Sequence, residues 1–170
     1  MISSTPMSID DQLNIAEKNL EFLLDWIGRY DNKSSVILGI DTGMLGVLAT
    51  FAPDKAFWDS WMILFAFSSI ILLLLSLLFV YLGNYPRLKG PSESLFYFGS
   101  ICKKCLIQYQ QGFSKRSKEE CLNDLLEQCH RNSEIINQKF NYLKWAYLLL
   151  LLSVIPWVIT IYLFRTITVP

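Results

Sequence analysis

Apolar residues gather in two long uncharged runs, which indicate the class of protein. Residues 61–82 contain no charged residue, proline or glycine, and residues 145–164 are also uncharged. At 1.5 Å rise per residue, about 20 apolar residues cross a hydrocarbon core of roughly 30 Å. Both runs predict transmembrane helices, since a buried soluble helix of this kind needs a very large core. Aromatic residues flank them, as at a membrane–water interface: Trp58, Trp61, Tyr81 and Tyr85, and then Trp145, Tyr147 and Tyr162.

A third apolar segment is shorter and contains an acidic residue. Residues 36–52 are close to the roughly 17-residue lower limit for a span, they include Asp41, and Pro53 follows them. We predict a third transmembrane helix here, and a re-entrant or interfacial hairpin is the alternative.

The segment before this span has the pattern of an amphipathic helix. Ser8 and Asp11 form a start that resembles a capping box. Apolar residues then recur at helical spacing through residues 8–30, with charged residues between them. Acidic residues stand where a signal peptide needs a basic region, so we expect no cleaved signal.

The segment between the second and third runs is predicted to be helical and water-exposed. Prolines and a glycine in residues 86–91 end the preceding helix. We expect a helix over residues 94–111 and a turn over 112–118. Ser117 and Glu120 form a capping box for the next helix, which we expect to run unbroken into the third span, where Pro156 can kink it.

The distribution of lysine and arginine predicts the orientation in the membrane. Residues 1–35 and 84–144 carry nearly all the basic residues, whereas the loop at 53–60 has only Lys55 and the C-terminal tail only Arg165. Basic loops stay in the cytosol, so the N-terminus is expected inside and the C-terminus outside, which in a bacterium is the periplasm.

Together these patterns predict an all-α integral membrane protein of the multi-pass type. We divide the chain into a cytosolic amphipathic helix (1–34), a transmembrane hairpin (35–83, with spans at about 36–52 and 61–82), a cytosolic helical region (84–143), a third transmembrane helix (144–165) and a periplasmic tail (166–170).

Enzymatic and metal chemistry find little support in the sequence. The chain has a single histidine and none of the common hydrolase, metalloprotease or nucleotide-binding loop motifs. Cys102 and Cys105 form a C-x-x-C, but Cys121 and Cys129 are eight residues apart and do not complete a zinc pattern. We therefore expect no enzyme, metal or cofactor and no nucleic-acid partner, and cysteines that stay as thiols in the cytosol.

The first span holds the residues most suggestive of function within the membrane. Gly39 and Gly43 form a G-x-x-x-G, and Gly46 extends this small-residue face. Such a face allows close helix approach, either within the chain or between copies. Asp41 lies about 7–8 Å along the helix from Val36. An ionisable group there can line a polar path or pair with a cation, or it can simply meet water near the headgroups.

Basic and polar residues on the cytosolic side suggest an anion site. Arg87 follows the second span, and Lys139 lies near Asn132 on the last cytosolic helix. Two cations with polar neighbours suit a phosphate-bearing ligand. The alternative, which physical chemistry alone favours, is that these cations face anionic lipid.

Four motifs in order resemble one known family. They are DNKSSVILGIDTG at residues 31–43, YPRL at 85–88, SLFYFGSI at 94–101, and QCHRNSEIINQKFNYL at 128–143. Their order and spacing are similar to those of the Pycsar effector transmembrane family. One departure is Ser34, where relatives often have alanine.

The resemblance implies an antiphage effector that binds cyclic CMP or cyclic UMP, made by a partner pyrimidine nucleotide cyclase, and that damages the inner membrane so that the cell dies. On this basis we expect the nucleotide to contact Arg87, Asn132 and Lys139, with Phe96 or Phe98 under the base. Binding would alter the packing or homo-oligomerisation of the spans at Gly39, Asp41, Gly43 and Gly46. A membrane-anchored scaffold and an ion channel or transporter accessory subunit are the alternatives.

Overall fold

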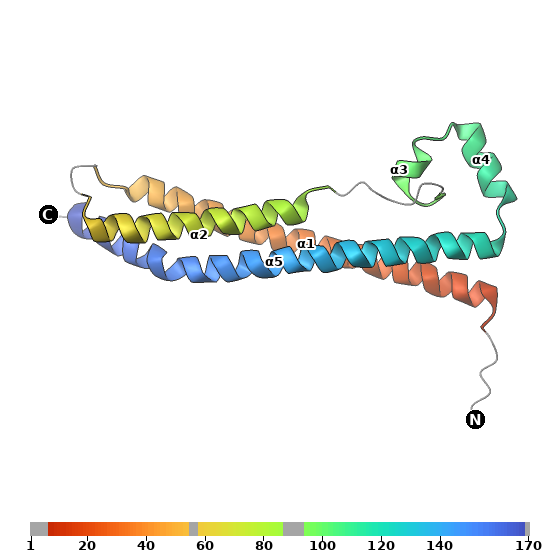
Figure 1. The fold of residues 1–170 in the computed structure, drawn as a ribbon, viewed down its shortest axis with the longest axis horizontal. Helices are drawn as coiled ribbons and strands as arrows, with labels where there is room; N and C mark the ends of the chain where they lie inside the picture. Colours follow the sequence, from red (N-terminus) through yellow and green to blue (C-terminus); the bar gives the residue numbers. More distant parts are fainter. Residues whose placement is uncertain (1–6, 55–57, 87–93, 169–170) are drawn as a thin grey trace, which may run out of the picture. The chain divides into compact units, whose positions relative to one another are not determined.

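The structure is a computed structural model that describes residues 7–54, 58–86 and 94–168. Its helices are α1 (Ile9–Phe51), α2 (Ser60–Asn84), α3 (Phe98–Ile101), α4 (Leu106–Lys115) and α5 (Lys118–Thr168) (Figure 1). The described residues contain no strand, which confirms the all-α prediction. Three helices, α1, α2 and α5, are long and apolar enough to cross a membrane.

The amphipathic segment and the first span form one helix. α1 runs without interruption from Ile9 to Phe51, because no proline separates the two segments. A hairpin within residues 36–52 was the alternative, and this continuous helix contradicts it. Ser8 accepts a hydrogen bond from the amide of Asp11 at 3.2 Å, as the predicted N-terminal cap requires.

The prediction of one helix over residues 94–111 is wrong. α3 ends at Ile101, and α4 begins only at Leu106. Cys105 has an extended backbone, and it caps α4 through a reciprocal pair of hydrogen bonds with Gln108. α4 then continues through Gly112 to Lys115, so the expected turn over residues 112–118 is confined to Arg116 and Ser117.

The last helix agrees with the sequence pattern. The Ser117 amide donates to Glu120 and the Glu120 amide donates to Ser117, which is the predicted capping box. α5 then continues through Pro156. The Thr160 hydroxyl donates to the Pro156 carbonyl at 2.7 Å, a local bond of the kind that accommodates proline in membrane helices.

The chain divides into two compact units. The first comprises residues up to 28 and residues 86–137, and the second comprises residues 29–85 and 138–170. In the first unit, the starts of α1 and α5 lie side by side around buried Ala16, Leu122 and Leu125. An ion pair between Lys118 and Asp10, at 2.6 Å, joins their N-terminal ends, so these two segments run parallel.

The second unit is a three-helix bundle whose buried positions alternate in steps of four and three residues. This spacing is the seam of a left-handed coiled coil. Many seam positions are small or polar, which allows close packing in lipid. The seam is formed by Tyr30, Ser34, Ile37, Asp41 and Leu48 of α1, by Met62, Ala66, Ser69, Leu73, Ser76, Val80 and Gly83 of α2, and by Leu143, Ala146, Leu150, Ser153, Thr160 and Phe164 of α5.

Candidate functional site

Residues from two of the sequence motifs meet at one end of the second unit. The Lys139 ammonium lies 2.9 Å from the Asp31 carboxylate and 4.5 Å from the centre of the Tyr30 ring. Phe140 packs edge-on against Tyr30, with ring centres 5.9 Å apart, and the Lys33 ammonium lies 5.9 Å from the centre of the Phe140 ring. We call these five residues the motif cluster, in which Tyr30 directly precedes the motif at 31–43 and the other four belong to the motifs. It joins α1 to α5 through charge and aromatic contacts.

The C-terminal end of α2 packs against the turn of α1 that contains Tyr30 and Ser34. Ser34 and Asn84 share a hydrogen bond at 3.3–3.4 Å. A Cβ atom on Gly83 would overlap the Tyr30 hydroxyl and lie 3.3 Å from the Cβ of Tyr142. Only glycine therefore fits at this point, where three helices come together.

Asp41 forms a second connection between the three helices, deep in the bundle. Its side chain is fully buried, and it accepts a hydrogen bond from Ser76 of α2 at 2.7 Å. The Ser76 hydroxyl also lies 3.0 Å from the carbonyl of Ala146 in α5. The other oxygen of Asp41 has no hydrogen-bond partner among the residues described. The fold therefore encloses Asp41, so its carboxylate is not exposed to water in this packing, and its depth relative to the headgroups stays a prediction.

The glycines of the first span face away from the bundle. Gly39, Gly43 and Gly46 are exposed, and a Cβ atom at any of them would have no neighbour within 4 Å. Packing within the chain, one of the two readings of the G-x-x-x-G motif, is therefore wrong for the part of the chain that the structure describes. Contact with another molecule remains a prediction.

The first unit contains a buried polar network around Asp124. One oxygen of Asp124 accepts hydrogen bonds from the amide of Leu95 at 2.8 Å and from Arg116 at 2.6 Å. One turn further along α5, Gln128 donates to the Ser94 hydroxyl at 3.0 Å. This network holds residues 94–97 against α5. Sequence reasoning missed it, although the i, i+4 spacing of Asp124 and Gln128 on one helix face was visible.

The network presents aromatic side chains to the surface. Ser94 accepts bonds from the amides of Phe96 and Tyr97, at 3.0 and 2.9 Å, which turns the chain before α3. Phe96 and Phe98 are 40% and 63% exposed, so part of each ring faces solvent. Gly99 lies under the Tyr97 ring, and a Cβ there would lie 2.5 Å from that ring unless the half-buried tyrosine moved.

The five predicted ligand residues are distributed as follows. Phe96, Phe98 and Asn132 belong to the first unit, and Lys139 belongs to the second. Asn132 is half-buried and follows Asp124 and Gln128 at the same spacing of four, so it continues the face of α5 that holds residues 94–97. Arg87 lies outside the described residues. The five-residue nucleotide site stays a prediction.

The cysteines do not gather into a metal centre in the described parts of the chain. Cys102 and Cys105 are exposed, whereas Cys129 is half-buried with its sulfur 3.5 Å from the carbonyl of Ala16. Burial raises the pKa of the Cys129 thiol, because the thiolate is poorly solvated there. No group of three or more histidine, cysteine or acidic residues suited to a metal occurs among the described residues.

Comparison with known proteins identifies a family that the chain matches. Residues 15–165 match the Pycsar effector protein domain. Among curated proteins, the Pycsar effector protein GmPycTM of Gulbenkiania mobilis is 29% identical over 79 residues. That alignment covers 42% of this chain and 40% of the relative, so it spans less than half of the relative's length. No solved structure matches the chain significantly.

Proposed function

Since the chain belongs to the Pycsar effector protein family, we propose that it is an antiphage defence effector. It binds cyclic CMP or cyclic UMP made by a partner pyrimidine nucleotide cyclase, impairs the bacterial inner membrane and causes abortive infection. The observation that carries this proposal is the extent of the family match, residues 15–165, which includes residues of both units. The protein performs no chemical reaction on its messenger.

The proposed ligand residues are Arg87, Phe96, Phe98, Asn132 and Lys139. Support comes from the exposed rings of Phe96 and Phe98, whose backbone is fixed by the buried network, because a fixed aromatic face loses little entropy when a base stacks on it. The Lys139 ammonium is bonded to Asp31. A nucleotide phosphate has to compete with that carboxylate, so binding would weaken the contact between α1 and α5.

The effect on the membrane follows from helices that belong to both units. α1 and α5 each begin in the first unit and end in the second without a break. A ligand shifts a conformational equilibrium only through different affinities for its two states. We propose that the bound state changes the packing around Asp41 and brings copies together through the exposed Gly39, Gly43 and Gly46.

The proposed topology follows the basic residues. The N-terminus and residues 84–143 face the cytosol, where the cyclase product is made, and the C-terminus faces the periplasm. A membrane protein of this orientation meets the messenger on the side where it is synthesised.

Direct binding tests the proposal first. The protein is purified in detergent and titrated by calorimetry with cyclic CMP, cyclic UMP, cyclic AMP and cyclic GMP. We expect one pyrimidine nucleotide to bind and the purines to fail. The Lys139→Gln and Asn132→Ala variants should each bind about ten-fold more weakly, since a charge-assisted or buried hydrogen bond contributes about 1.5 kcal/mol. Lys103→Gln, an exposed substitution in the first unit, is the control.

Membrane damage is tested separately in cells. The effector is expressed with and without an active pyrimidine cyclase, and entry of a membrane-impermeant dye is measured. Dye entry only with the cyclase supports the proposal. Dye entry without any messenger indicates a constitutive channel, and no binding with no dye entry indicates a scaffold.

A further inference from the structure

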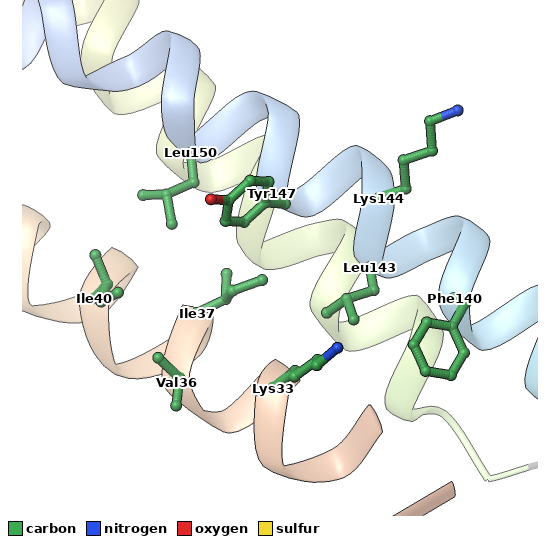
Figure 2. A pocket seen from close by; sticks show the side chains of 9 residues that line it. All are labelled: Lys33, Val36, Ile37, Ile40, Phe140, Leu143, Lys144, Tyr147 and Leu150. Carbon is green, nitrogen blue, oxygen red and sulfur yellow. The ribbon is translucent and has the colours of Figure 1, made fainter. Parts of the chain in front are cut away.

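A cavity of about 500 Å³ opens between α1 and α5 of the second unit. This volume lies within the roughly 300–1,000 Å³ range of small-molecule pockets. Its walls are Val36, Ile37 and Ile40 on α1, and Leu143 and Leu150 on α5 (Figure 2). The walls are apolar over most of their length. From Lys33 to Ile40 the cavity extends about 10 Å along α1, at standard helical rise.

Two lysines stand at one end of this cavity. Lys33 and Lys144 both contribute to its lining, and Figure 2 shows them toward the Phe140 end, opposite Ile40 and Leu150. Lys33 lies near the Phe140 ring, and the ammonium of Lys144 extends outward from the rim. Neither lysine forms an ion pair with a carboxylate of the described residues. The cavity is thus amphipathic, with largely apolar walls, the Lys33 ammonium near the Phe140 ring at its mouth, and Lys144 on its rim with an ammonium that points away from the cavity.

We propose that this cavity binds one anionic phospholipid, with an acyl chain between α1 and α5 and the phosphate at Lys33, toward which the exposed side chain of Lys144 turns. The walls belong to two of the helices that are apolar enough to span a membrane. In that setting the apolar part of the cavity must be filled, since an unfilled groove forfeits packing contacts and the Tyr147 hydroxyl by itself offers a water too few polar partners. An acyl chain meets this requirement. The two cations select a negatively charged headgroup at the same end.

A lipid at this site would affect the packing of α1 against α5. Lys33 and Phe140 belong to the motif cluster, in which Lys139 bonds Asp31. A lipid held between α1 and α5 there stabilises the two helices as they are packed in this structure. Bilayers poor in anionic lipid should therefore leave the α1–α5 packing weaker. This inference concerns the lipid alone and requires no nucleotide.

Native mass spectrometry of the full chain in detergent tests the site directly. The probes are dioleoyl phosphatidylglycerol, which is anionic, and dioleoyl phosphatidylcholine, which is not. We expect one phosphatidylglycerol per chain to be retained in preference to phosphatidylcholine. Each lysine near an anionic lipid surface raises the affinity about five-fold. The double variant Lys33→Gln with Lys144→Gln should therefore bind phosphatidylglycerol roughly 25-fold more weakly.

Two further variants separate the cavity from general surface charge. Lys103→Gln with Lys115→Gln removes the same charge from exposed positions of the first unit and should retain the lipid. Ile40→Trp fills the apolar end without changing charge, and it should reduce retention of phosphatidylglycerol. Ile40 is 45% exposed, so the larger ring is tolerated by the fold.

The same spectra contain the results that would overturn the inference. Equal loss in both lysine pairs would mean that only net charge attracts lipid. Unchanged retention in Ile40→Trp would mean that no chain occupies the cavity. No retained lipid, together with a shift from dimers to monomers in Ile40→Trp, would show that a second copy covers this surface instead.

Discussion

The substitution Gly83→Ala tests the three-helix packing most sharply. The added Cβ would overlap the hydroxyl of Tyr30, which is fully buried, and would lie 3.1 Å from Cζ of the same ring. The Cβ of Tyr142 would be only 3.3 Å away, and a Cβ atom cannot move aside without its backbone. Overpacking of this kind costs about 1–3 kcal/mol. For a chain of this length that corresponds to a fall in Tm of roughly 2–12 °C.

Gly43→Ala provides the matched control. It makes the same chemical change in a membrane helix, but its Cβ would have no neighbour within 4 Å. Alanine at this position can therefore raise the stability through its higher helix propensity, by about 1 kcal/mol at most, and no steric clash offsets the gain. The difference in Tm between the two variants isolates the packing penalty at Gly83.

The assay is thermal unfolding in dilute detergent, followed by tryptophan fluorescence at one fixed scan rate because membrane proteins often unfold irreversibly. Tyr30→Phe supplies a second check, since it removes the overlapped hydroxyl. We expect Gly83→Ala to cost less in the Tyr30→Phe background, with a coupling of at least about 0.5 kcal/mol. Equal Tm values for the two glycine variants, or the same cost of Gly83→Ala in both backgrounds, would refute the packing described above.

Three other substitutions or reactions probe the polar contacts. Ser76→Ala removes the donor to Asp41 and should lower the free energy of unfolding by about 1–3 kcal/mol in a denaturant titration, whereas adding Asp41→Val should recover part of that loss. Asp124→Asn removes the ion pair with Arg116 and weakens the hydrogen bond from the Leu95 amide, so amide hydrogen exchange in residues 94–97 should become faster. Unchanged exchange rates in these residues would contradict the network. Burial raises the pKa of Cys129, so less of this thiol is thiolate at pH 8. Maleimide should therefore label Cys129 more slowly than the exposed cysteines of the C-x-x-C motif. The labelling rate of Cys129 should still rise as the pH is raised above 8.

Hydropathy and capping residues were sufficient to predict most helices. The uncharged runs at 61–82 and 145–164 lie within α2 and α5, because a span of lipid requires length and apolarity rather than any particular neighbour. Ser117 and Glu120 located the start of α5 for a similar reason, since a cap is a local contact. The four motifs that resemble the family could also be read from the sequence alone.

The non-helical start of residues 94–111 could not be read in the same way. These residues contain no proline, which would be the strongest local signal against a helix. Ser94 and Leu95 are instead bonded to Gln128 and Asp124, residues about 30 positions away. A contact at that sequence separation outweighs local propensity, and no window of the sequence contains both partners.

The sequence by itself determined that the chain is helical, that three of its helices can span a membrane, and which family it resembles. Only the tertiary structure decided which face of each span is inside. In lipid, apolar residues cover every face of a helix, so hydrophobic periodicity carries no contrast. The inner face is marked instead by small and polar residues, and their partners are known only once the helices meet. Asp41 therefore proved to be buried against Ser76, while Gly43, two residues further along, faces outward.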